Sequence, residues 1–140
     1  MTDRDVMEYD VVVVGGGPAG LACAIRLKSA KPETTVCVLE KGSELGAHTL
    51  SGAVMEPEAL DELWPEWRED QPSISVPAGD DEFLLLTRRK GFRLPTPPQM
   101  KNHGNFIISL GSLVSKLGAR AEALQIDVFP GFPASELLVE

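Results

Sequence analysis

Three glycines at positions 15, 17 and 20 have the spacing of a loop that binds phosphate groups. They belong to the stretch GGGPAG, which directly follows the apolar run VVVV at residues 11–14. In a strand that turns into a helix, free backbone N–H groups and the positive end of the helix dipole face the phosphate. Gly15 permits the tight turn, Gly17 admits a pyrophosphate close to the backbone, and Gly20 lets the helix approach the strand. The spacing therefore predicts a dinucleotide site.

Four further residues complete this predicted site. Pro18 suits a first helical turn, where its missing N–H costs no hydrogen bond, and Ala19 follows it in the same turn. Glu40 ends a second apolar run, VCVL, at the place where a carboxylate can bind both hydroxyls of an adenosine ribose and repel a 2′-phosphate. Lys41 follows it. The pattern favours NAD or FAD over NADP and leaves those two open.

A βαβ unit is needed to position these residues. The branched side chains of residues 11–14 predict a parallel strand covered on both faces, and residues 36–39 predict a second strand. Between them, residues 21–30 have the period of a helix. The side of this helix that faces the sheet is expected to carry Ala19, Ala22, Cys23 and Ile25. The predicted fold class is α/β with a Rossmann-like sheet, and an unrelated glycine turn is the weaker alternative.

After Glu40, residues 41–54 predict an ordered loop that runs back over the sheet, because small and hydroxylic residues lie among glycines. In an FAD protein such a loop passes the flavin, so Ser51 and Gly52 are candidates for contact with the isoalloxazine ring. His48 is better explained as an exposed or hydrogen-bonded loop histidine than as a proton donor.

A short helix is predicted at residues 56–63, followed by Trp64 and Trp67 beside several acids. Tryptophan packs in cores more often than elsewhere, but its ring also suits a membrane interface. Both interpretations stay open here, with packing favoured. Following a polar tail at residues 1–8, residues 9–70 are thus expected to hold the βαβ unit, the flavin loop and a short membrane-interface helix.

The remaining chain predicts an insertion and then a return to the sheet. Proline-rich residues 71–81 predict a loop, and two short apolar strands around a basic turn predict a hairpin at residues 82–94, within an insertion at 71–101. Residues 102–140 predict a helix with Leu110 and Leu124 near its ends, where Gly111 and Gly118 suggest close packing. Parallel strands are expected at residues 126–129 and 135–139.

The composition restricts the partners. The chain has 140 residues, 43% hydrophobic content and a net charge of −8, which argues against nucleic acid as a partner. Residues 83–121 nevertheless contain no acid and seven basic residues. This basic stretch could meet phosphate, anionic lipid head groups or an acidic protein, and a solvated face explains it about as well. Cys23 and Cys37 are expected to be reduced core residues, with a disulfide or metal pair as the weaker alternative.

No targeting or spanning segment is expected. Residues 1–5 are polar, without the pattern of an export or import signal, and no run of eighteen apolar residues occurs. A cytoplasmic location is therefore expected. A sheet of this kind needs a later return of the chain to close over the cofactor, so we expect the N-terminal portion of a longer polypeptide.

Several stretches together resemble one family. Residues 9–20 (YDVVVVGGGPAG) resemble the FAD motif of many flavoproteins. Taken with residues 45–53 (LGAHTLSGA), 94–100 (LPTPPQM) and 102–106 (NHGNF), the chain resembles the electron transfer flavoprotein-ubiquinone oxidoreductases. The resemblance implies a Rossmann-like FAD-binding βαβ sheet with a small antiparallel insertion, as an incomplete part of a larger flavoprotein.

The resemblance also implies an activity. The family takes electrons from reduced electron transfer flavoprotein and passes them to ubiquinone, through FAD and one [4Fe-4S] cluster whose ligands lie downstream of this chain. It implies peripheral contact with a membrane, near residues 50–67, and location on the cytoplasmic face of a bacterial inner membrane. No residue of this chain is expected to ligate a metal or to act in acid–base catalysis.

Two departures from the family pattern and two alternatives remain. Gln125 stands where the family usually has glycine, so a left-handed helix cap is expected to be strained or replaced there. Lys116 stands where an aromatic or apolar residue is common. The alternatives are another FAD oxidoreductase of the same fold, such as a monooxygenase or an isoprenoid reductase, and a catalytically silent FAD-binding fragment. The 140 residues alone are not expected to be a competent enzyme.

Overall fold

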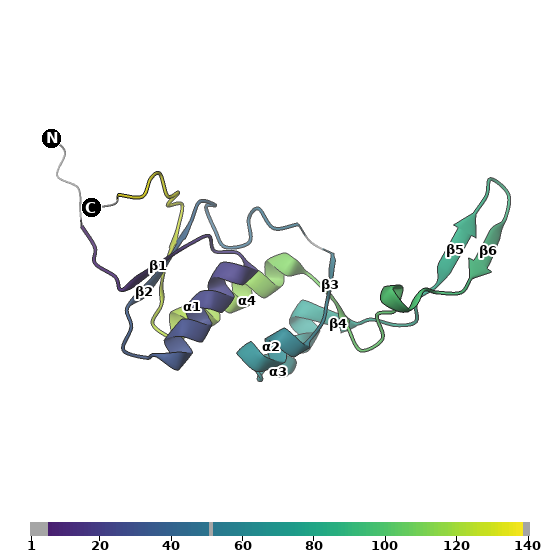
Figure 1. Cartoon of the computed structure of the whole chain (residues 1–140), viewed down its shortest axis with the longest axis horizontal. Coiled ribbons are helices and arrows are strands. Elements are labelled where there is room, and N and C mark those ends of the chain that lie inside the picture. Colours follow the sequence, from purple (N-terminus) through teal and green to yellow (C-terminus); the bar gives the residue numbers. More distant parts are fainter. Residues whose placement is uncertain (1–5, 51, 139–140) are drawn as a thin grey trace. The chain divides into compact units, whose positions relative to one another are not determined.

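The computed structural model of the chain describes residues 6–50 and 52–138 (Figure 1). The chain divides into two compact units, the first made of Met1–Ser51 with Leu110–Glu140 and the second of Gly52–Ser109. This division differs from the segments 9–70 and 71–101 expected from the sequence. Antiparallel pairing of residues 53–55 with residues 106–108 groups the start of the second unit with its end.

The first unit contains a three-stranded parallel sheet. Its strands are β1 (Val11–Val14), β2 (Val36–Glu40) and β8 (Asp127–Pro130), in the order β1-β2-β8. The central strand pairs with both neighbours in parallel register, which places the carboxyl ends of all three strands at one edge of the sheet. The predicted strands at residues 11–14, 36–39 and 126–129 are confirmed, the last one shifted by one residue.

Two helices pack beside this sheet and against each other (Figure 1). They are α1 (Pro18–Ala30) and α4 (Leu110–Ala123). The buried residues of α1 are Leu21, Ala24 and Ile25, so the prediction that Ala19 and Cys23 face the sheet is wrong: both are exposed. Helical geometry explains this, because Cys23 lies about 200° around the helix from the buried Leu21.

The prediction that β1 is covered on both faces is wrong for the residues that the structure describes. Val12 and Val14 are exposed, whereas the alternate residues Val11 and Val13 are half-buried. Successive side chains of a strand point to opposite faces of the sheet. Within residues 6–50 and 52–138, therefore, only one face of β1 is covered.

The end of α4 carries the left-handed residue that the sequence analysis anticipated. Gln125 has a φ of 61°. The Gln125 amide donates to the Glu122 carbonyl and the Ile126 amide donates to the Ala121 carbonyl. These two bonds make a Schellman cap, whose left-handed position usually holds glycine because glycine has no Cβ.

After β8, the chain crosses the end of β2 without forming a strand. The Gly131 amide donates to the Gly42 carbonyl over 2.7 Å, and the Phe132 amide donates to the Glu40 carbonyl over 2.9 Å. The predicted strand at residues 135–139 is wrong for residues 135–138, which have no regular secondary structure.

The second unit contains a small antiparallel sheet that the sequence analysis missed. The strand order is β3 (Ala53–Met55), β7 (Phe106–Ile108) and β4 (Ser75–Pro77). Two helices accompany it, α2 (Glu58–Leu63) and α3 (Trp67–Ile74). The predicted short helix is confirmed as α2, but the loop predicted at residues 71–81 is wrong, since α3 and β4 occupy residues 71–77.

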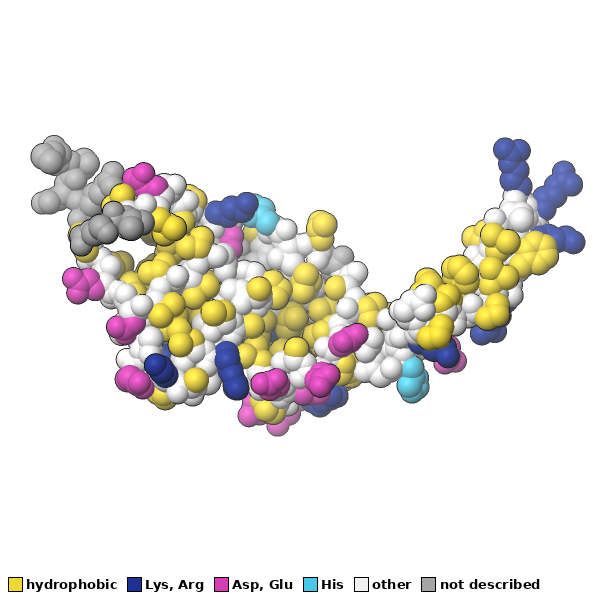
Figure 2. All heavy atoms as spheres, viewed as in Figure 1, with side chains coloured by type: hydrophobic (Ala, Val, Ile, Leu, Met, Phe, Trp, Pro, Cys, Tyr) yellow, Lys and Arg dark blue, Asp and Glu magenta, His cyan; other side chains and the backbone are white. Residues whose placement is uncertain are grey.

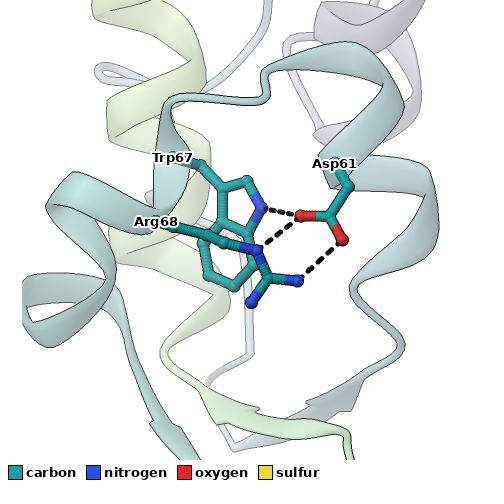
Figure 3. Close-up of polar contacts among 3 residues, drawn as sticks. All are labelled: Asp61, Trp67 and Arg68. Carbon is teal, nitrogen blue, oxygen red and sulfur yellow. Dashed lines mark hydrogen bonds and ion pairs between the residues drawn. The ribbon is translucent and has the colours of Figure 1, made fainter.

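Trp64 and Trp67 are core residues of the second unit. Trp67 is fully buried, and its ring packs edge-on against Phe106 with 5.2 Å between centroids. The Trp67 indole N–H donates to Asp61 Oδ1 over 2.7 Å, and the Arg68 guanidinium donates to both Asp61 oxygens (Figure 3). The packing interpretation is therefore correct for both tryptophans, and a membrane-facing Trp64 is wrong for this conformation.

The predicted hairpin is confirmed. It consists of β5 (Phe83–Leu86) and β6 (Gly91–Leu94), and its turn is closed by the Thr87 amide donating to the Lys90 carbonyl. A short 3-10 helix, η1 (Pro98–Met100), follows. Figure 2 shows the hairpin as a largely hydrophobic surface with basic side chains at its tip. No helix formed by the described residues is long and apolar enough to cross a membrane.

Candidate functional site

The loop between β1 and α1 has the geometry that the glycine spacing predicts. Gly15 has a φ of +107°, a conformation that residues with a Cβ rarely adopt. A Cβ on Gly20 would overlap the Gly15 carbonyl oxygen, so glycine at this position lets α1 begin against the loop. A Cβ on Gly17 would meet no protein atom within 4 Å. The space above Gly17 is therefore open to a ligand.

The amino end of α1 offers backbone donors to that space. Pro18 occupies the first turn, and no side chain caps the helix at Gly17. The amides of a first helical turn have no intrahelical acceptor, and the helix dipole adds partial positive charge. Ala19 lies exposed in this turn. An anionic group above Gly17 would meet these donors, which fits the pyrophosphate of a dinucleotide.

Glu40 stands at the end of β2, beside this loop. Its Oε2 accepts a hydrogen bond from the Gly16 amide over 2.8 Å, and its Oε1 accepts one from the Gly42 amide over 2.6 Å. The Gly42 hydrogen bond is the main cause that lowers the pKa of Glu40, with support from the Gly16 amide and from His48 and Lys41, while desolvation opposes it. Glu40 is therefore a carboxylate at neutral pH.

The two backbone hydrogen bonds leave Glu40 able to bind a ligand. A carboxylate has about four lone-pair sites, so Glu40 retains two after accepting from Gly16 and Gly42. Two ribose hydroxyls could occupy them. A ligand phosphate at the same place would be repelled by the negative charge.

A cavity of about 210 Å³ lies at this edge of the sheet. It is lined by Val14, Gly15, Leu39, Glu40, Lys41, Phe132, Pro133 and Ala134. The Phe132 ring is partly exposed and contacts Phe129, with 5.7 Å between centroids. The cavity thus combines one carboxylate with an aromatic ring and apolar walls, which suits a nucleoside.

The sequence analysis missed residues 132–134 as part of the site. It assigned the end of the chain to another strand, whereas the turn at Pro130 and Gly131 brings the chain back over β2. The clustered prolines and glycine of residues 130–133 were the available signal, because they disfavour a strand interior.

The two predicted flavin contacts stay predictions. Ser51 lies outside the described residues. Gly52, with a φ of +89°, belongs to the second unit. The loop, Glu40 and Lys41, by contrast, all lie in the first unit, and Lys41 lines the cavity.

The segment after Lys41 is held against α4. Leu45 fills the space that a Cβ on Gly118 would need, and its side chain also reaches Gly16. Gly46, with a φ of +83°, lies against the backbone of Gly111. These contacts confirm the prediction of close packing at Gly111 and Gly118, and they hold the segment after Lys41 beside the site.

The cysteines and acids that the structure describes do not form a metal centre. Among these residues no group of three or more His, Cys, Asp or Glu side chains could hold a metal ion. Both cysteines are free: Cys37 is buried, and desolvation raises the pKa of its thiol, while Cys23 is exposed, contrary to the core position expected for it. His48 is exposed in its loop.

Comparisons with known proteins agree with this geometry. A family model described as an NAD(P)-binding Rossmann-like domain matches residues 13–68. The chain is 55% identical to a mitochondrial electron transfer flavoprotein-ubiquinone oxidoreductase of Oryza sativa subsp. japonica, over 98% of this chain and 24% of that protein. It is 49% identical to an electron transfer flavoprotein-ubiquinone oxidoreductase of Pseudomonas aeruginosa, over 99% of this chain and 26% of that protein.

A solved structure supports the fold. A geranylgeranyl bacteriochlorophyll reductase-like protein from Thermoplasma acidophilum superposes with a TM-score of 0.69 over 94% of this chain and 32% of that one, at 24% identity. This likeness shows the fold alone. The chain spans about a quarter of the length of the curated relatives it matches. The predicted Rossmann-like α/β fold is thus confirmed, and the chain is similar over nearly its whole length to part of the electron transfer flavoprotein-ubiquinone oxidoreductases.

Proposed function

We propose that this chain binds FAD as part of a longer polypeptide that transfers electrons from reduced electron transfer flavoprotein to ubiquinone. The observation that carries the proposal is the arrangement of Glu40 beside the open glycine loop, on a chain 55% identical to an oxidoreductase of that name. NAD fits the same loop, but the relatives that match nearly the whole chain are named for transfer between a flavoprotein and a quinone.

The residues of this chain would bind and orient the cofactor. The first-turn amides of α1 would take the pyrophosphate, and Glu40 would accept hydrogen bonds from the ribose hydroxyls. Phe132 would lie against the adenosine part, because it lines the cavity next to Glu40. Bound FAD supplies reversible electron acceptance, so the protein's part is to set its position and surroundings and no acid–base residue is required here.

The described part of this chain does not fit a [4Fe-4S] cluster. Such a cluster is held by four cysteine thiolates. Cys23 and Cys37 are the cysteines of the chain, one exposed on α1 and the other buried in β2, and both are free. A cluster of the longer protein would therefore take its ligands from outside these 140 residues.

Membrane contact belongs to the same proposal, with a different location from the one expected. The expected contact near residues 50–67 loses its main support because Trp64 and Trp67 are buried. The β5–β6 hairpin is the better candidate, since its large apolar side chains are exposed along both strands. We place this contact on the cytoplasmic face of a bacterial inner membrane, where no spanning helix is needed for peripheral attachment.

The proposed function is tested by asking which electron donor reduces the bound flavin. FAD-loaded full-length protein would be mixed anaerobically with reduced electron transfer flavoprotein, and in parallel with NADH or NADPH, while its flavin absorbance is followed. We expect bleaching by the flavoprotein and reoxidation by a soluble ubiquinone analogue. Bleaching by NADH or NADPH alone would instead favour a monooxygenase or reductase of the same fold. A flat visible spectrum after FAD is added to the 140-residue chain would favour the silent fragment.

A further inference from the structure

The consecutive glycines at positions 15–17 give the phosphate-binding loop little stiffness of its own. Glycine loses more conformational freedom on ordering than any other residue, so such a loop depends on neighbouring groups to hold it. Gly16 is buried at the centre of this loop. Its amide donates to Glu40 Oε2 over 2.8 Å, which ties the loop to the end of β2. A second contact, with a different physical basis, comes from Leu45.

The Leu45 side chain lies between Gly16 and α4. A Cβ built on Gly16 would stand 2.5 Å from Leu45 Cδ2, and a Cβ built on Gly118 would overlap Leu45 Cδ1. The two methyl groups of one side chain thus occupy the space that side chains on both glycines would need. Protein interiors are packed as densely as organic crystals, so a side chain in such a space transmits displacement from one neighbour to the other. The half-buried Leu45 therefore connects α4 with the centre of the phosphate-binding loop.

The backbone beside Leu45 is itself held against α4. A Cβ on the next residue, Gly46, would stand 3.2 Å from the Gly111 carbonyl oxygen. Gly111 and Gly118 are seven residues apart, which is close to two helical turns, so both lie on the same face of α4. Because this segment contacts α4 through its backbone as well as through its side chain, Leu45 has little freedom to move away from Gly16.

We infer that Leu45 is a positioning residue for the FAD pyrophosphate: it packs against Gly16 and keeps the loop amides in the orientation that binds phosphate. The inference rests on the FAD binding proposed above and adds a residue that does not line the cofactor cavity. A loop that is ordered before the ligand arrives binds more tightly than one that must be ordered on binding. Glu40 and Leu45 share this task, one through a hydrogen bond and the other through packing.

The test titrates full-length protein, freed of its flavin, with FAD and follows the quenching of flavin fluorescence. Leu45→Ala should weaken FAD binding roughly tenfold, within the range over which contacting side chains couple. Gly118→Ala should weaken it as well, because the added Cβ displaces Leu45 toward Gly16. Gly111→Ala is the matched control on the same face of α4. Its Cβ would have the Gly46 carbonyl oxygen as nearest neighbour, 4.0 Å away, so this variant should bind FAD normally.

A double variant separates positioning from a general loss of packing. If Leu45 transmits the displacement, Gly118→Ala should have no further effect on FAD affinity once Leu45 is replaced by alanine. A weakened helix would instead lower the affinity equally in both backgrounds. The phosphorus NMR resonances of the bound pyrophosphate should shift in Leu45→Ala. They should stay unchanged in Leu124→Ala, which removes a half-buried leucine directly after α4. Urea denaturation shows that each titrated variant is folded.

The outcomes distinguish this inference from the proposed function. If Leu45→Ala bound FAD as tightly as the unmodified protein, the positioning role would be overturned and FAD binding itself would stand. Strictly additive effects of Leu45→Ala and Gly118→Ala would overturn the positioning role too, as would unchanged phosphorus resonances in Leu45→Ala. Failure of the unmodified protein to bind FAD would overturn both the inference and the proposed function.

Discussion

The Glu40 carboxylate accepts the Gly16 amide hydrogen bond over 2.8 Å, so the end of β2 directly holds the glycine loop that follows β1. The second oxygen of Glu40 holds the Gly42 amide in the same way. The residue expected to bind the ribose therefore also shapes the phosphate-binding loop. Loss of the Glu40 charge should therefore lower both the stability of the fold and the affinity for the ligand.

The first prediction concerns pH. Hydrogen bonds in the folded state lower the pKa of Glu40, so its contribution to stability is present above the unfolded pKa and is lost as pH falls through the folded value. Glu40→Gln has no such titration. In urea denaturation series at decreasing pH, the unmodified protein should be more stable than Glu40→Gln near neutrality, and the difference should shrink in acid. A constant difference would show that the charge of Glu40 is unimportant.

Two glycine variants should separate folding from ligand binding. Gly20→Ala should destabilise the protein by about 1–3 kcal/mol, because its Cβ would overlap the Gly15 carbonyl oxygen. Gly17→Ala has free space around its Cβ and should change stability by less than about 1 kcal/mol. It should nevertheless weaken FAD binding, since the Cβ would stand where the pyrophosphate approaches. Urea denaturation and FAD titration of both variants check this, and normal FAD binding by Gly17→Ala would refute the loop's assigned role.

Asp61 should be important for the stability of the second unit. Asp61→Ala leaves the N–H of the buried Trp67 without its acceptor and is expected to cost about 1–3 kcal/mol. The exposed Glu69 on α3, the helix that carries Trp67, provides the control, and Glu69→Ala should change stability by less than about 0.5 kcal/mol. Adding Trp67→Phe to Asp61→Ala should cost less than the two single changes summed, because both polar partners are then absent. Strict additivity in thermal unfolding would argue against the hydrogen bond.

The parts of the fold set by local pattern could be predicted from the sequence. Local residue types predict three features: the strand β1 from its branched side chains, the loop from its glycines, and the carboxylate at the end of β2. The structure brings these three features together. The strands β3, β4 and β7 could not be predicted, because three residues are too few to show a period and their pairing is between distant segments.

Other errors came from context that a sequence does not contain. Trp64 and Trp67 were compatible with a core or a membrane interface. The burial of both side chains, and the contacts of Trp67 with Asp61 and Phe106, favour the core. Residues 132–134 line the cavity because the turn after β8 directs the chain back toward β2. The composition of the segment does not predict the direction of that turn.

The cap of α4 offers a stabilising change. Gln125 adopts a φ of 61°, which is strained for a residue with a Cβ, so Gln125→Gly should stabilise the protein by about 1 kcal/mol. Gln125→Ala retains the Cβ and should bring no such gain. Chemical denaturation of both variants checks the prediction, and equal stability of the two would show that the left-handed conformation is not the cause.

FAD titration of Glu40→Ala, followed by the quenching of flavin fluorescence, tests the account most directly. The affinity for FAD should weaken by about 1–3 kcal/mol, because the ribose hydroxyls lose their acceptor and the Gly16 amide is released. Glu44→Ala, which removes an exposed carboxylate from the same loop, should bind FAD like the unmodified protein. An FAD titration unchanged by Glu40→Ala would contradict the assignment of this site.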